Sequence, residues 1–470
     1  MIIAEDTPES PTKTVPANLP LQYSTPPPAY GSTTSNVPIH VVPEHPRPLF
    51  PQEPPCRRSP AKRFCKAFCV AILIWFLVAM FTSSITNAGG FYHGGGYWQD
   101  VRVFDSDFPI PDGYTVRECI RGQNWTSTGS EGAVPTGQRH SAHKLFDLPL
   151  NSETLFLLSQ GSLSSGVVKI VTSPSITDVV RIDVTMQYYN NRVLDYAKVC
   201  LLQRQAGENG VGVFTPRWFN NPSYQDRPHF DITVVIPEPS SSSASNIKNF
   251  ETDVPNFAQI LQDLENHVHF GKIFLKGTNA PIQVESLDAL GAEVHTSNGP
   301  IKGFFVASGN LVLKTSNAPM RVDVDLGDMD VTRSTLELST SNNLVEAGIK
   351  LSSPSSDVSA HTSNGPLRVQ VLESPVDSTV IFNARTSNAF AEVGLPPTYE
   401  GTFSLSTSHM QPSLLVEETS DPAWRGRHRT VKQNTVRRGE TIGEVYWDER
   451  NRVRGTATVR SSNGPVSLKL

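Results

Sequence analysis

Thr296-Ser297-Asn298-Gly299-Pro300 is one copy of a phrase that recurs through the C-terminal half of the sequence. Ser, Thr and Asn side chains hydrogen-bond to nearby backbone, and Asn tolerates the left-handed region. The following Gly accepts a positive φ and the Pro favours an extended exit, so each copy predicts a turn. The asparagines of these turns are Asn298, Asn317, Asn342, Asn364, Asn388 and Asn463.

The segments on either side of each turn alternate apolar and polar residues. Leu311 and Leu313 precede one turn, and Leu367, Val369 and Val371 follow another. Alternation over such short runs predicts half-buried strands. The core asparagines from position 279 to 388 are 19, 19, 25, 22 and 24 residues apart, and spacing in this range is typical of repeat proteins.

One strand–turn–strand unit cannot bury its apolar face alone, so neighbouring units must stack. The sequence therefore predicts an all-β fold with repeats of ~20 residues, either a β-solenoid or a rolled two-layer β-sheet. The turn asparagines are expected at equivalent corners of successive layers. Residues 247–470 are predicted to form this repeat domain, and residues 453–470 are expected to close it as a hairpin.

A short helix near 254–266 is predicted to cap the repeats, because four apolar residues between 257 and 264 fall on one helical face. Residues 101–239 lack the turn phrase but are rich in apolar and β-branched runs. They predict either a separate N-terminal β-rich subdomain or an irregular first layer of the same sheet system.

Residues 1–66 contain 15 of the 37 prolines and almost no apolar periodicity, which predicts a disordered tail. Pro27, Pro28 and Tyr30 form a Pro-Pro-x-Tyr string in this tail. That form resembles the ligand by which WW domains of ubiquitin ligases are recruited. A proline-rich tail also produces such strings by chance, and a second copy ending at Tyr399 falls between two predicted strands.

Residues 67–85 carry no charge and are long enough to cross ~30 Å of hydrocarbon as a helix. A single-pass transmembrane helix is predicted over 67–86, as a signal-anchor, because it lies too far from the N-terminus for a cleaved signal peptide. Basic residues cluster just before it, so the positive-inside rule places the tail in the cytosol and the rest outside. A Gly-rich stalk over 87–100 follows. The expected location is the plasma membrane or an endomembrane.

The five cysteines fit this topology. Cys56, Cys65 and Cys69 lie at the cytosolic membrane edge, where thiols can be palmitoylated. Cys119 and Cys200 are the only two on the outer side, where a disulfide could persist. Asn124 begins the sole N-glycosylation sequon and falls on that same side, so a glycoprotein is expected.

The sequence contains no Walker loop, dinucleotide fingerprint, His-Glu-x-x-His or nucleophile elbow. No catalytic residue, metal ligand or cofactor is therefore predicted, and the chain is expected not to be an enzyme. The acids between 323 and 330 faintly resemble a calcium loop, but the apolar residues between them favour solvent-facing acids on a strand. The net charge of −5 argues against a nucleic-acid partner.

Basic residues beside the turns would share one face if the repeats stack in phase. Such a ladder could bind anionic glycans or phosphates, and a merely solvated face is the alternative. The predicted polyanion-binding residues are Lys302, Lys314, Arg321, Arg368, Arg385 and Arg460, with His295 and His361 in the same register.

The layout of a proline-rich tail, one membrane span and a repetitive β ectodomain resembles a group of fungal single-pass membrane proteins of unassigned function. The repeats, roughly residues 270–470, are also similar to bacterial adhesin repeat domains, which form all-β rolls with Thr-Ser-x-Gly turns. This resemblance implies an adhesin-like ectodomain and brings no catalytic motif with it.

The favoured interpretation is a non-enzymatic surface or endomembrane protein whose ectodomain serves binding or structure. Its expected partners are the membrane, a WW-domain protein on the cytosolic side, and a glycan or protein ligand outside. One alternative is a trafficking or ubiquitin-ligase adaptor that acts through the tail motif. The other is a carbohydrate-active β-helix enzyme, which would need paired carboxylates in a groove.

Overall fold

The structure, a computed structural model, describes residues 103–128, 140–218, 222–238, 244–328 and 330–470. The chain divides into two units, 1–98 and 99–470, and all described residues belong to the second. The predicted tail, membrane span and stalk lie outside the described residues, as do Pro27, Pro28, Tyr30 and the three membrane-edge cysteines. Within the described ranges, no helix has the length and apolar character needed to cross a membrane.

The described chain is nearly all β, which confirms the predicted all-β class. Its helical elements are short turns: η1 (Asp105–Asp107), η2 (Gly122–Asn124), α2 (Val193–Tyr196), η3 (Tyr224–Asp226) and η4 (Glu449–Asn451).

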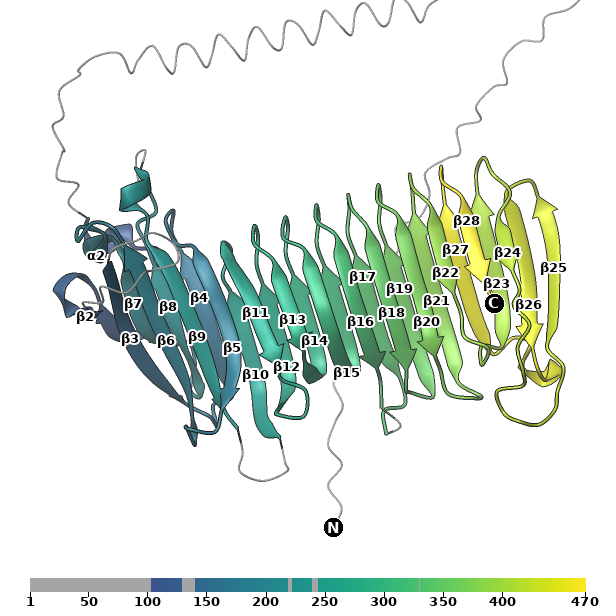
Figure 1. The fold of residues 1–470 in the computed structure, drawn as a ribbon, viewed down its shortest axis with the longest axis horizontal. Helices are drawn as coiled ribbons and strands as arrows, with labels where there is room; N and C mark the ends of the chain where they lie inside the picture. Colours follow the sequence, from purple (N-terminus) through teal and green to yellow (C-terminus); the bar gives the residue numbers. More distant parts are fainter. Residues whose placement is uncertain (1–102, 129–139, 219–221, 239–243, 329) are drawn as a thin grey trace, which may run out of the picture. The chain divides into compact units, whose positions relative to one another are not determined.

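Most strands belong to two parallel series, because each repeat places one strand before its turn and one after it (Figure 1). We call these series the upstream track and the downstream track. The upstream track runs in spatial order through β8 (Glu208–Phe214), β4 (Thr154–Gln160), β10 (Ser245–Asp253), β12 (Val268–Lys276), β14 (Asp288–His295), the second half of β15 (Ile301–Lys314), β17 (Ser334–Ser339), β19 (Ser355–His361), β21 (Thr379–Thr386), β27 (Gly455–Ser461) and β23 (Gly401–Thr407).

The downstream track follows the same order on the other side of the turns. It contains β9 (His229–Pro237), β5 (Gly166–Ser173), β11 (Phe257–Asp263), β13 (Ile282–Ser286), the first half of β15, β16 (Met320–Leu326), β18 (Val345–Leu351), β20 (Leu367–Glu373), β22 (Ala391–Gly394), β28 (Val466–Lys469) and β24 (Ser413–Leu415).

Antiparallel strands extend the tracks at both ends. At the N-terminal end these are β1 (Thr115–Ile120), β2 (Thr126–Thr128), β3 (His140–Pro149), β6 (Val179–Tyr188) and β7 (Lys198–Gln203). At the other end β26 (Glu440–Tyr446) pairs with β23, and β25 (Thr430–Arg437) pairs with β26.

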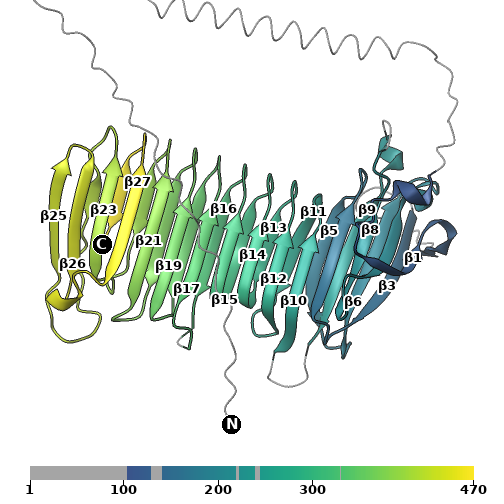
Figure 2. The same cartoon turned by 180° about the vertical axis from the view of Figure 1, so that it is seen from behind.

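The order of the rungs departs from the order of the chain at each end. β27 inserts between β21 and β23, as Figure 2 shows, and β28 inserts between β22 and β24. Likewise β4 lies between β8 and β10. The predicted closing hairpin at 453–470 is therefore wrong, because its two strands each pair with neighbouring rungs in parallel.

Alternation of side chains places the core between the two tracks. In β20, Leu367, Val369 and Val371 are buried while Arg368 and Gln370 point outward. Each fully buried Val or Leu contributes about 1.5–3 kcal/mol, so the stack is stabilised mainly by these residues. One continuous cluster of buried side chains extends from Ile120 to Leu470.

The predicted capping helix near 254–266 is wrong, because this segment contains strand β11. Phe257, Gln259 and Leu261 point inward, which is a period of two. The buried Gln259 accepts a hydrogen bond from the Thr252 hydroxyl (2.7 Å) and donates to the Lys276 carbonyl oxygen (3.0 Å). A polar residue that finds partners inside the core concealed the strand alternation from the sequence pattern.

The expected boundary between 101–239 and 247–470 does not separate two compact units. β4 pairs with β10 and β5 pairs with β11, both in parallel register. The N-terminal strands are thus part of the same sheet system, which was the other alternative that the sequence left open.

Candidate functional site

Each turn phrase forms a corner between the two tracks, with its threonine inside. Thr362 is fully buried; its hydroxyl donates to the Asn343 carbonyl oxygen of the preceding corner (3.2 Å) and accepts from the Gly365 N–H (3.1 Å). A Cβ at Gly365 would lie 1.8 Å from that same carbonyl oxygen. Glycine is therefore needed at this position for the close approach and not for a positive φ, which Gly365 does not adopt.

The corner asparagines are exposed and stack into a continuous ladder. None of them has a positive φ, so these turns do not use the left-handed region that Asn tolerates. Each amide nitrogen donates to the amide oxygen one corner earlier: Asn279 to Asn256 (2.8 Å), Asn298 to Asn279 (2.8 Å), Asn317 to Asn298 (2.7 Å), Asn342 to Asn317 (2.7 Å), Asn364 to Asn342 (2.6 Å), Asn388 to Asn364 (2.6 Å) and Asn463 to Asn388 (2.7 Å).

The outward residue just before each corner lines up with its counterpart on the next rung. On the rung before Lys276 this line contains Asp253. We call the part of the line from Lys276 onward the basic row. In spatial order it consists of Lys276, His295, Lys314, Ser339, His361, Arg385, Arg460 and Ser406.

The predicted polyanion-binding residues do not all join this row. Lys302, Arg321 and Arg368 follow the corners and lie on the downstream track, where Glu346 and Glu392 interleave with them. Lys302 is opposite Arg321. From Arg321 to Glu392 the charges alternate along the track: Arg321 pairs with Glu346 (3.1 Å), and Arg368 pairs with Glu392 (3.6 Å). Exposed pairs of this kind contribute little to stability, but they neutralise the surface.

The arginine end of the basic row has the opposite arrangement. Arg385 and Arg460 are directly opposite each other on neighbouring strands, and both are exposed. They border a hollow of about 490 Å³ that also involves Ser406, Ser408, Ser462 and Arg438. We call these six residues and their hollow the arginine groove.

Charge compensation is missing in the arginine groove. Its one lining carboxylate, Glu440, pairs with Arg437 (2.6 Å). Among the described residues, neither Arg385 nor Arg460 forms an ion pair. Like charges opposite each other on neighbouring strands destabilise a sheet. The groove therefore concentrates uncompensated guanidinium groups, which match carboxylate, sulfate and phosphate oxygens in a bidentate geometry.

The middle of the basic row is more neutral. Lys314 pairs with Glu337 (2.9 Å), which lies two residues before Ser339 on the next strand. Burial lowers the pKa of His295 below its ordinary value, with Glu293 acting in the opposite direction, so burial favours the neutral imidazole. No group of three His, Cys, Asp or Glu side chains in the described ranges could hold a metal ion. The calcium-like stretch lies partly on β16, where Asp323 is exposed and Asp325 accepts from the Ser352 hydroxyl (3.1 Å).

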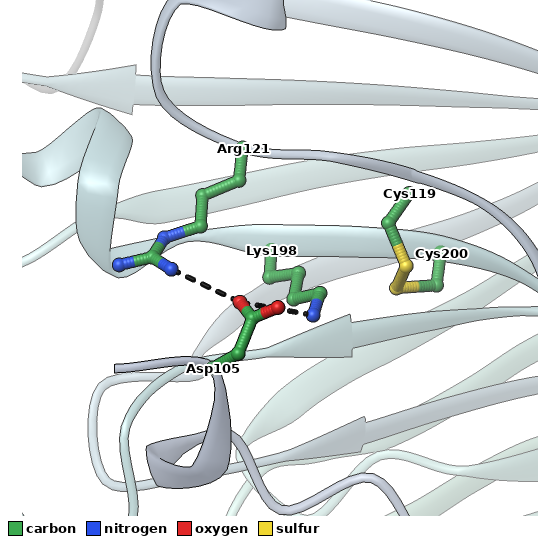
Figure 3. Close-up of a disulfide and its surroundings, with 5 residues drawn as sticks. All are labelled: Asp105, Cys119, Arg121, Lys198 and Cys200. Carbon is green, nitrogen blue, oxygen red and sulfur yellow. Dashed lines mark hydrogen bonds and ion pairs between the residues drawn. A yellow bond between two sulfur atoms is a disulfide. The ribbon is translucent and has the colours of Figure 1, made fainter. Parts of the chain in front are cut away.

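Cys119 and Cys200, the two cysteines predicted to lie on the outer side, are brought together at the N-terminal end of the upstream track. Cys119 on β1 and Cys200 on β7 form a disulfide (Figure 3). Close by, Asp105 pairs with Arg121 (3.1 Å) and Lys198 (3.4 Å). These contacts fasten the first described segment to the sheet, and Asn124 is exposed in the neighbouring turn η2.

Two further groups have structural roles. Tyr399 in the second Pro-Pro-x-Tyr string is buried and donates its hydroxyl to the Thr402 carbonyl oxygen (2.6 Å), so this copy presents no free aromatic anchor. The buried carboxylate of Glu400 accepts from the backbone N–H groups of Trp447 (2.7 Å) and Asp448 (2.9 Å) and from the Asn451 amide (2.7 Å). These bonds hold the connection from β26 to β27.

No protein-family model matches the chain, and no curated protein does. Similar solved structures include a candidate cell adhesion protein from Clostridium sporogenes ATCC 15579, with 9% identity over 70% of this chain and 99% of that chain, and a TM-score of 0.15. Another is a candidate lipid binding protein from Parabacteroides distasonis ATCC 8503, with 13% identity over 55% of this chain and 90% of that chain, and a TM-score of 0.24. At these TM-scores the similarities carry no argument about ligand or function.

Proposed function

We propose that the protein is a membrane-anchored, non-enzymatic binding protein whose arginine groove takes up an anionic group of an extracellular or lumenal glycan. In this proposal the unit 99–470 is a rigid β-solenoid that presents the groove, and the uncharged run 67–85 holds it in the plasma membrane or an endomembrane. Parallel pairing along both tracks supports the solenoid. The basic residues just before the predicted span support a cytosolic N-terminus.

The observation that carries the anion-binding proposal is the contrast between the two sides of the corners. On the downstream track Arg321 is opposite Glu346, and Arg368 lies between Glu346 and Glu392, so both arginines are compensated. On the upstream track Arg385 and Arg460 lie next to each other without a carboxylate partner among the described residues. An anionic ligand would remove the repulsion between them, and that gain favours binding.

The test compares two double variants of the full-length chain, solubilised in a neutral detergent. Arg385→Gln/Arg460→Gln removes the groove charges, and Arg321→Gln/Arg368→Gln removes the same charge from the downstream track. We expect the first to weaken binding of β-1,4-linked dimannuronate about tenfold or more by calorimetry, because a hydrogen bond to a charged group contributes ~1.5–3 kcal/mol. The control variant should bind like the unmodified chain.

Equal losses in both variants, or no binding by the unmodified chain, would overturn the proposal. The same samples also test the enzyme alternative. Shorter sugars appearing on prolonged incubation with longer oligomannuronates would contradict the non-enzymatic assignment.

A further inference from the structure

A second hollow lies at the far end of the basic row. It measures about 640 Å³ and involves Gln160, Arg217, Trp218, Asp253 and Lys276, together with the corner residues around Asn256. Lys276 is also the first residue of the basic row. The row therefore connects this hollow, which we call the tryptophan hollow, to the arginine groove.

The chemistry of the tryptophan hollow fits a sugar ring. Trp218 is 87% exposed, and a flat indole in water is a surface on which an apolar ring face can stack. Around it, the Gln160 amide and the Arg217 guanidinium make no side-chain hydrogen bond with the described residues. Asp253 pairs with Lys276 (2.9 Å) and keeps acceptor capacity for hydroxyl groups. An aromatic platform surrounded by planar polar groups is a combination that recognises hydroxylated rings.

The connecting row has the geometry of a track. Five strand steps separate Lys276 from Arg385, which at ~4.8 Å per step gives about 24 Å, and a sixth step reaches Arg460. Between the two ends the row contains only Lys, His and Ser, and no carboxylate. An extended chain of equatorially linked pyranose rings advances by nearly the same distance per sugar as one strand step.

We infer that the basic row is a track for one linear acidic polysaccharide of about six sugar units, with carboxylates in the arginine groove and one ring stacked on Trp218. This inference rests on the proposed function of the groove. Nucleic acid fits the track poorly, because single strands are bound by several stacking aromatics and this row offers one at its end.

The experiment measures affinity against ligand length for the full-length chain in neutral detergent. The probes are β-1,4-linked oligomannuronates of two to ten units, and cello-oligosaccharides of the same lengths provide the same linkage without carboxylates. We expect the oligomannuronate affinity to rise up to about six units and then level off. The neutral sugars should bind at least tenfold more weakly.

Variants separate the two ends of the track. Trp218→Ala should lower hexamer affinity about threefold to tenfold, the range expected for one aromatic stacking contact, and leave dimer binding unchanged. Trp218→Phe should restore most of the loss. The matched control is Trp424→Ala, which removes an aromatic side chain that is 90% exposed and lines neither hollow.

The outcomes distinguish the two proposals. If no oligomannuronate of any length binds, the function of the arginine groove fails and the track fails with it. If the dimer binds through Arg385 and Arg460 but neither length nor Trp218 affects affinity, only the track is overturned. Single-stranded oligonucleotides binding with the same length dependence and the same Trp218 effect would also overturn the polysaccharide assignment.

Discussion

Two polar side chains of one corner stabilise the fold in different ways. The Thr362 hydroxyl satisfies a carbonyl oxygen and an N–H inside the core, whereas the Asn364 amide forms its ladder bonds at the exposed surface. A buried group that loses its partner keeps the full cost of desolvation, and an exposed one is solvated by water instead. The buried threonine should therefore matter more than the conspicuous asparagine.

This difference is testable with single substitutions. Thr362→Val keeps the shape and leaves buried backbone groups without their partner, so we expect it to destabilise the protein by about 1–3 kcal/mol. Asn364→Ala should cost about 1 kcal/mol or less. Thermal unfolding followed by circular dichroism measures both, with Thr456→Val, an exposed threonine of β27, as the control. A larger effect of Asn364→Ala would contradict this assignment.

At the scale of the element, the insertion of β27 and β28 makes the last residues part of the interior of the stack. β27 forms parallel ladders with β21 on one side and with β23 on the other. A chain that ends at residue 454 lacks β27 and β28. The edges of β21 and β23 that face β27 would then carry unpaired backbone groups, and the core around Phe382 and Phe403 would open.

We expect the truncated chain 1–454 to lose amide hydrogen-exchange protection from β21 to β26, while β12 to β18 remain protected. A synthetic peptide covering 455–470 should restore protection, because the gap accepts a strand with the right side chains in register. A peptide with Val459→Asp is the matched control and should not restore it, since Val459 is fully buried. Uniform protection in the truncated chain would refute the inserted position.

These elements also show what sequence reasoning can recover. Turn phrases and flanking alternation predict the strands and the row that contains Lys314, Arg385 and Arg460. They cannot predict that the rung of Asn463 inserts between two earlier rungs of the chain. Any two rungs can form the same backbone hydrogen bonds, so the pattern does not specify which rungs are neighbours. Applying the repeat register to the residue after each corner would have revealed Glu346 and Glu392. Trp218 and Arg438 had no such signal, since both lie where the repeat phrase is missing.

For the molecule as a whole, the described unit begins with a segment that is fastened to the sheet. Asp105 bridges Arg121 and Lys198, and the Cys119–Cys200 disulfide joins two neighbouring strands within the same region. Structural disulfides persist in oxidising compartments and are rare in the cytosol. The disulfide and the exposed sequon at Asn124 therefore both favour the proposed placement of the unit outside the cytosol.

Glycosylation at Asn124 and the Cys119–Cys200 disulfide can be tested in the same cells. In cells that express the full-length chain, we expect glycosidase treatment to shift its gel mobility, and Asn124→Gln to abolish that shift, because glycan transfer occurs only on the lumenal side. Cys119 and Cys200 should resist alkylation until a reductant is added. Cys119→Ser/Cys200→Ser should lower the free energy of unfolding by about 2–4 kcal/mol, since the bond closes a long loop. A chain without glycan whose two thiols are freely alkylated would place the unit in the cytosol and overturn the topology.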